Sequence, residues 1–255
     1  MSVFLALLKR EMQAIFLSPV AYACGILALL GSGFCFMILL ASQLRMGPSF
    51  ALKNMVHLFF AGFILIWFAQ IFLVSALTMR LFSEEKRSGT IEPLLTAPVT
   101  DVQVVLAKYA GALLYWLLLW LPTLGYFLVL GSKAFEWKLL GSAYLGVALV
   151  GAMTVAVGCL ASALCTSQMV AALFSSTGLT ALLFGPPMLL SFTTVRWEWL
   201  RKTLEYLNVL PLGPHTLLGD FCEGLGSLGH LFYPISVTAA CLFVTVKVLS
   251  SRSWK

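Results

Sequence analysis

Residues 139–192 contain no Asp, Glu, Lys or Arg, and they form the longest uncharged stretch of the sequence. A helix that crosses the hydrocarbon core of a bilayer needs about 20 apolar residues, so this stretch is too long for one crossing. Its most polar point is Thr166-Ser167-Gln168, and we expect a short turn there. The stretch would then form two antiparallel membrane spans that lie next to each other.

The rest of the chain has the same apolar character. Hydrophobic residues make up 60% of its 255 residues and charged residues only 10%, whereas a soluble protein is about a quarter charged. We therefore predict an all-α integral membrane protein with a single transmembrane domain over residues 1–255. Hydropathy places six transmembrane helices near residues 20–42, 56–79, 105–131, 139–164, 168–192 and 230–249.

Two details indicate how the fourth and fifth spans are built. Small residues, among them Gly158 and Ser162, recur along the fourth span and favour close helix packing, within the chain or against another subunit. Gly185-Pro186-Pro187 lies in the fifth span, and proline disturbs a helix interior. We interpret it as the kinked end of that span, with a broken helix at a transport site as the alternative.

Residues 1–19 form a separate N-terminal element. Apolar side chains recur on one helical face, while Lys9, Arg10, Glu11 and Gln13 fall largely off that face. This pattern predicts an elbow helix that lies in the membrane interface. A signal peptide is the weaker interpretation, because the charges follow the first apolar run. Ser18-Pro19 should end the helix.

Residues 193–229 form the longest segment outside the spans, and mix turn residues with short apolar runs. This composition favours short re-entrant or interfacial helices. With six spans both termini lie on one side. Placing them in the cytoplasm puts nine of the sixteen Lys and Arg residues inside, as the positive-inside rule favours. The segment 193–229 is then extracytoplasmic.

The side chains that usually hold metals or form disulfides are scattered. Five of the six cysteines fall inside apolar runs, Cys222 falls in a predicted loop, and no pair has CxxC spacing. We therefore expect no metal site and no disulfide framework. The net charge of +6 comes from basic residues beside apolar runs, which favours contact with the membrane surface, and we expect no nucleic-acid partner.

The connector 82–108 holds the densest cluster of charge, Glu84-Glu85-Lys86-Arg87. Ser88-Gly89 should end this cluster, and Pro93 limits any helix that follows. Thr100 and Gln103 match a capping box, in which each side chain accepts a hydrogen bond from the other residue's backbone N–H. The helix of the third span should therefore begin near Asp101. On its residues alone, the connector also fits an ordinary solvated loop.

The string SEEKRSGTIEPLLTAPVT, residues 83–100, resembles the signature of ABC-2 type permeases of ATP-binding-cassette exporters. The segment KREMQAIFLSPVAY, residues 9–22, is similar to the gliding-motility-type branch of that family. The resemblance implies a cytoplasmic coupling segment over residues 80–104 that contacts an ATPase. The implied coupling residues are Glu84, Glu85, Lys86, Arg87, Gly89, Thr90, Ile91, Glu92, Leu94 and Leu95. Pro93 departs from many relatives and leaves open whether the coupling helix is broken.

The resemblance further implies two cytoplasmic ATPase subunits, a second permease subunit of the same or another chain, and a bacterial inner membrane. The chain lacks a GxxxxGK[ST] phosphate loop, so ATP and Mg²⁺ would bind to the partner. We expect no catalytic residues in this chain. The leading hypothesis is the membrane subunit of an ATP-driven exporter, and the uncharged spans favour a lipidic, amphipathic or polymeric cargo.

Three alternatives belong to other functional classes. A secondary transporter would need ionisable residues within the membrane, and the inner parts of the predicted spans contain none. A membrane enzyme would need convergent catalytic groups. The outer-side candidates are Glu198, Asp220, Glu223, His215, His230 and Cys222, whose spacing matches no metal site or catalytic triad. A membrane scaffold is the third alternative.

Overall fold

The computed structural model describes residues 3–46, 53–89, 100–130, 137–192, 214–224 and 228–251. These residues are almost entirely helical and contain no strand, so the predicted all-α membrane fold is confirmed. The elements are α1 (Val3–Phe16), α2 (Pro19–Met46), α3 (Lys53–His57), η1 (Leu58–Gly62), α4 (Ile64–Thr78), α5 (Arg80–Ser88), α7 (Asp101–Leu130), α8 (Trp137–Leu164), α9 (Gln168–Phe192), α11 (Pro214–Cys222) and α12 (Leu228–Ser250).

Five helical stretches in the described part of the chain are long and apolar enough to cross a membrane, and they lie on α2, α4–α5, α7, α8 and α12. α9 carries a shorter apolar stretch, Gln168–Phe184. α8 ends at Leu164 and α9 begins at Gln168. The expected division of the uncharged stretch is therefore confirmed.

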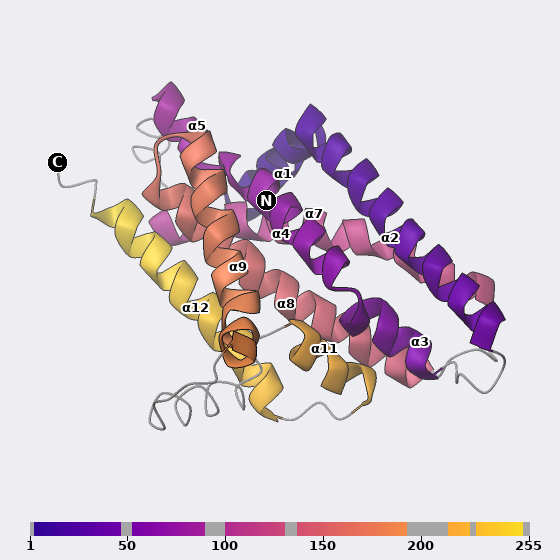
Figure 1. The fold of residues 1–255 in the computed structure, drawn as a ribbon. Helices are drawn as coiled ribbons and strands as arrows, with labels where there is room; N and C mark the ends of the chain where they lie inside the picture. The colour runs from indigo at the N-terminus through magenta and orange to yellow at the C-terminus, as the bar shows by residue number, and fades with distance from the viewer. Residues whose placement is uncertain are drawn as a thin grey trace, which may run out of the picture.

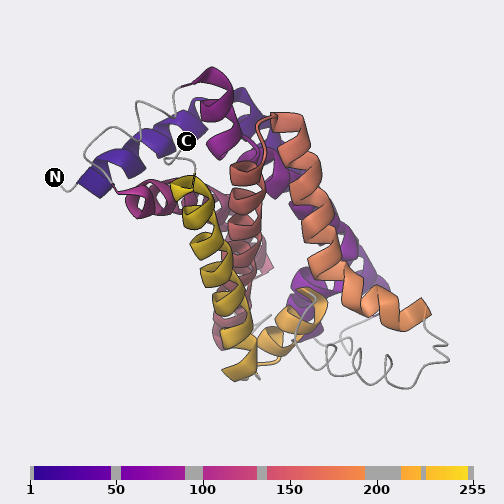
Figure 2. The ribbon, with the colours of Figure 1, turned by 90° about the vertical axis from the view of Figure 1, so that its left-hand side faces the viewer.

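α8 is the central helix of the bundle, with α12 and α9 on either side of it (Figure 2). Close packing on α8 depends on glycine. A Cβ atom added at Gly151 would lie 2.1 Å from the Trp116 ring of α7, and one added at Gly158 would lie 2.3 Å from Oγ1 of Thr78 on α4. The small residues of the fourth span therefore pack within the chain.

The second span differs from the single helix expected over residues 56–79. A π-helical turn, η1, leads into a break at Phe63, whose φ and ψ are −90° and 90°. The indole Nε1 of Trp67 donates a hydrogen bond of 2.7 Å to the Phe60 carbonyl across this break. The Phe60 carbonyl at the break is thus hydrogen-bonded inside the protein. Irregular backbone within a membrane is tolerated only where its polar groups are satisfied in this way.

The end of the fifth span and the segment after it are partly described. α9 continues through Gly185-Pro186-Pro187, and its last turns change direction (Figure 2). Residues 193–213 and 225–227 of the predicted segment 193–229 lie outside the described residues. Between them, the short helix α11 packs against α8, where the Ser142 hydroxyl donates a 2.6 Å hydrogen bond to the Phe221 carbonyl.

The bundle has two distinct ends. α1, α5 and the last turn of α12 lie at one end, and α3 and α11 lie at the other (Figure 1). α1 runs across the bundle at a large angle to α8 (Figure 2), as expected for an interfacial elbow helix. The predicted coupling segment and the elbow helix therefore meet at the same end of the molecule.

Candidate functional site

The start of α5 is held by a side chain from α8. Met79, which precedes α5, provides no side-chain cap. Instead the Ser162 hydroxyl accepts hydrogen bonds from the backbone N–H groups of Phe82, at 3.0 Å, and Ser83, at 3.2 Å. The same hydroxyl lies 3.1 Å from the Met79 carbonyl, to which it donates. A serine of the small-residue stripe thus joins α5 to the end of α8.

α5 has an inner and an outer face. Leu81, Phe82 and Ser83 are buried, whereas Glu84, Arg87 and Ser88 are exposed. The Lys86 ammonium donates a hydrogen bond to the Ala163 carbonyl, which gives α5 a second link to α8. Gly89 ends the helix in the left-handed region, at φ 71°, which glycine adopts without strain.

A buried ion-pair cluster joins three helices beneath α5. Lys108 of α7 lies 2.7 Å from Oε1 of Glu85 and 3.1 Å from Oε2 of Glu11 on α1. Arg10 lies 2.8 Å from Oε1 of Glu11 and 3.6 Å from Oε1 of Glu85. The side chains of Lys108 and Glu11 are only 3% and 9% exposed. Two cations and two carboxylates therefore balance each other, with Lys108 and Glu11 shielded from water and Arg10 half exposed at the edge of the cluster.

The sequence pattern does not predict this cluster. The pattern assigns Glu85 to contacts with a partner and places Glu11 on the polar face of the elbow helix. The buried face of α1 is instead centred on Glu11 and Ile15. Both approach Gly111 of α7, where an added Cβ would lie 3.3 Å from the Glu11 Cβ. The sequence feature that could have indicated the cluster is Lys108, a single cation that lies two turns after the start of a membrane helix.

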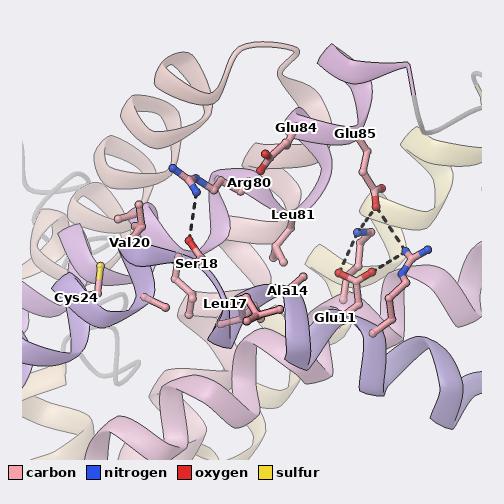
Figure 3. A pocket seen from close by; sticks show the side chains of 16 residues that line it. Glu11, Ala14, Leu17, Ser18, Val20, Cys24, Arg80, Leu81, Glu84 and Glu85 are labelled. Atoms are coloured by element: carbon pink, nitrogen blue, oxygen red, sulfur yellow. Dashed lines mark hydrogen bonds and ion pairs between the residues drawn. The ribbon is translucent and has the colours of Figure 1, made fainter.

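A cavity of about 490 Å³ lies beside the cluster, between α1, α2, α4 and α5 (Figure 3). The Arg80 guanidinium stands over it, and its Nη1 donates a 3.2 Å hydrogen bond to the Ser18 hydroxyl at the turn between α1 and α2. Glu84 and Glu85 point toward the same space from α5 (Figure 3). The cavity therefore has charged groups on one side and apolar helix surfaces on the other.

The end of the connector has the predicted cap. The Gln103 N–H donates to the Thr100 hydroxyl, the Thr100 N–H donates to Oε1 of Gln103, and both distances are 3.3 Å. α7 begins at Asp101, where it was expected. Thr90, Ile91, Glu92, Leu94 and Leu95 lie outside the described residues, as does Pro93.

The sequence model of a family described as "ABC-2 family transporter protein" matches residues 42–245, about four fifths of the chain. The chain belongs to this family. No curated protein matches the sequence closely enough to count as a relative. The family match includes Glu85 and Lys108 of the ion-pair cluster but not Arg10 and Glu11. This ABC-2 family chain is thus a membrane component of an ABC transporter. Its predicted elbow helix, α1, lies before the matched residues.

The opposite end of this ABC-2 family protein holds most of the residues weighed for an enzyme. Nε2 of His230 lies 2.9 Å from Oδ2 of Asp220, which joins α11 to α12. Cys222 was expected in a loop but ends α11, where it is buried. Burial raises the pKa of the Cys222 thiol to about 12, so the thiol is protonated at neutral pH and is a weak nucleophile. Glu198 lies outside the described residues.

Proposed function

We propose that this chain is the permease subunit of an ATP-driven exporter, in which a separate ATPase subunit docks on α5 and the connector that follows it. The observation that carries the proposal is that two sets of contacts attach α5 to the rest of the bundle. Its inner face is joined to α7 and α1 through Glu85 and Lys108, and to α8 through Ser162. A force applied to α5 would therefore reach three other helices directly.

Among the coupling residues that the structure describes, the side-chain positions on α5 define two groups. Glu84 and Arg87 are exposed on α5 and would contact the ATPase together with Glu92. Ile91, Leu94 and Leu95 would supply the apolar anchor, because buried apolar groups carry most of the binding energy at an interface. Glu85 and Lys86 point into the protein, so their proposed role is to transmit movement.

The full assembly we propose contains two ATPase subunits that bind ATP and Mg²⁺, and a second permease subunit beside this one. Its location is the bacterial inner membrane, with both termini and α5 on the cytoplasmic side. The shared position of α1, α5 and the end of α12 at one end of the bundle supports this arrangement (Figure 1). The similarity of residues 9–22 to the gliding-motility-type branch supports a place in that branch.

Co-purification of the chain with its ATPase tests the docking. Leu94→Asp/Leu95→Asp should reduce the amount of bound ATPase by more than about tenfold, because charge in an apolar anchor is costly. The matched control is Thr166→Asp, which adds a charge at the exposed turn between α8 and α9 and should leave binding unchanged. Native mass spectrometry of the wild-type complex should give two ATPase and two permease subunits. Full retention of the ATPase by the double variant would exclude this docking surface.

A further inference from the structure

The cavity below Arg80 continues along the outside of the bundle. A second cavity of about 440 Å³ lies between α2 and α4, and the two cavities share Cys24 and Ala76 in their linings. The two cavities therefore adjoin each other at Cys24 and Ala76, and together they are here called the α2–α4 groove. It begins at the charged cluster and runs into the membrane-spanning part of the two helices.

The deep part of this groove suits a hydrocarbon chain. Apart from Ser32 and Gln70, its lining is apolar. Cys35, Ile66 and Leu73 are buried on its floor, while Leu27, Phe34 and Phe72 are exposed at its edges. The groove follows α2 from Cys24 to Cys35, a rise of about 16 Å, which is close to the roughly 15 Å depth of one leaflet of a 30 Å hydrocarbon core.

The mouth of the groove offers a cation to a bound molecule. Arg80 donates to the neutral Ser18 hydroxyl, and no carboxylate pairs with it among the residues that the structure describes. Its Nε is buried and lacks a hydrogen-bond partner within the same residues. A guanidinium presents donors in a planar fork that matches phosphate oxygens.

The other charges at the mouth do not neutralise Arg80. The four charged groups of the ion-pair cluster balance one another within 3.6 Å. Glu84 is the remaining carboxylate of the lining. It is exposed, so water and salt screen its effect on Arg80. The mouth therefore favours an anionic group at Arg80, directly above an apolar channel.

We propose that the α2–α4 groove binds a phosphate-bearing membrane lipid. The phosphate would contact Arg80 beside Ser18, and one acyl chain would lie between α2 and α4. Because the edges of the groove are exposed apolar side chains, the lipid would enter sideways from the leaflet. The bound molecule would touch α2, α4 and Arg80, the first residue of α5. It would therefore contact the helix on which the ATPase is proposed to dock.

Photolabelling of the full chain in lipid nanodiscs tests this site. The probe is a diacyl phospholipid that carries a diazirine in one acyl chain, and mass spectrometry locates the labelled residues. Labels should concentrate on residues 24–35 and 66–76. Arg80→Gln should reduce this labelling at least about fivefold, since it removes a charged hydrogen-bond donor, and Arg80→Lys should give an intermediate value.

Two glycines supply a matched pair of blocking variants. A Cβ atom added at Gly31, in the groove, or at Gly178, on α9, would have no neighbouring atom within 4 Å. Both replacements by leucine should therefore fold. Gly31→Leu should fill the groove and abolish its labelling, whereas Gly178→Leu should leave it unchanged. Labelling needs no ATPase, so its result is independent of the docking experiment.

Four results would overturn the proposal. Labels spread evenly over the exposed faces of the helices, insensitive to Gly31→Leu, would mean that the groove is ordinary lipid-facing surface. Equal labelling by a diazirine diacylglycerol would remove the role of the phosphate. Complete competition by inorganic phosphate would indicate a simple anion site. Formation of a disulfide-linked dimer by Gly31→Cys would mean that a second copy of the chain covers the groove.

Discussion

The Lys108 ammonium group lies 2.7 Å from Oε1 of Glu85, a residue 23 positions earlier in the chain. The segment between them contains the proposed docking residues, so this ion pair closes the connector into a loop whose two ends are fixed to each other. Because Lys108 also contacts Glu11 at 3.1 Å, the elbow helix is attached to the same point. A displacement of the connector must therefore move α1 and α7 or break a buried ion pair.

Replacement of Lys108 by methionine tests this relationship. The variant leaves Glu11 and Glu85 close together with only the half-exposed Arg10 to compensate them, and breaking a buried ion pair typically costs about 3–5 kcal/mol. We expect a clear decrease in the unfolding temperature, measured by tryptophan fluorescence in detergent. The ATPase should still co-purify, because the exposed face of α5 is unchanged, but stimulation of its activity by the permease should be lost.

The companion variant of Lys108→Met removes the carboxylates as well. Glu11→Gln/Glu85→Gln/Lys108→Met leaves Arg10 as the remaining charge of the cluster, and its side chain is 52% exposed and reaches water, so this variant should be more stable than Lys108→Met alone. Arg87→Gln, at an exposed position of α5, is the control and should unfold at the wild-type temperature. If Lys108→Met unfolds at the wild-type temperature too, the ion pairs contribute nothing to stability.

Ser162→Ala should loosen the attachment of α5 to α8. The change removes the acceptor for two backbone N–H groups and the donor to the Met79 carbonyl, and leaving buried polar groups unpaired costs about 1–3 kcal/mol each. Hydrogen exchange followed by mass spectrometry should show faster exchange at Phe82 and Ser83. Ser176→Ala removes only a bond within α9 and should leave their exchange unchanged. Equal exchange in both variants would show that Ser162 does not hold α5.

The five helical stretches that are long enough to cross a membrane could be predicted from hydropathy because each is a nearly uncharged run bounded by polar residues, and membrane insertion depends mainly on that pattern. The cap at Thr100 was predictable because a capping box is local, with both partners three residues apart. Such features depend on neighbours in sequence. The helix boundaries at Gln168 and Asp101 agree with the structure for the same reason.

The inward position of Glu85 was not predictable in this way. Its partners Arg10 and Lys108 lie far from it in sequence, and only the tertiary packing of α1 on α7 makes their side chains meet. The break at Phe63 has a similar cause, since Trp67 can satisfy the Phe60 carbonyl only in the folded bundle. A charge on an amphipathic helix is usually solvated, and Glu11 is buried because a cation from another helix reaches it.

Gly151→Ala should be strongly destabilising although it adds only one methyl group. The new Cβ would lie 2.1 Å from the Trp116 ring, which is 1% exposed and has little room to move. Overpacking of this kind typically costs about 1–3 kcal/mol or more. The yield of monodisperse protein in size-exclusion chromatography should fall. Gly178→Ala, where the added atom meets nothing within 4 Å, should keep or raise the yield, and similar losses from both variants would contradict the close approach of α7 and α8.

Cysteine labelling in intact cells tests the proposed orientation. In a Cys165→Ser background, which removes the partly exposed native cysteine of the turn between α8 and α9, cysteines are introduced at Ser167 in that turn and at Glu223 after α11; both positions are exposed. If α5 and both termini are cytoplasmic, a membrane-impermeant maleimide should label Glu223→Cys in cells whose outer membrane has been made permeable, whereas Ser167→Cys should react only after lysis. The native Cys222 should stay unlabelled at neutral pH, because burial raises the pKa of its thiol to about 12 and only the thiolate reacts. The reverse pattern, with Ser167→Cys labelled in intact cells, would place the connector outside the cytoplasm and rule out a cytoplasmic ATPase as its partner.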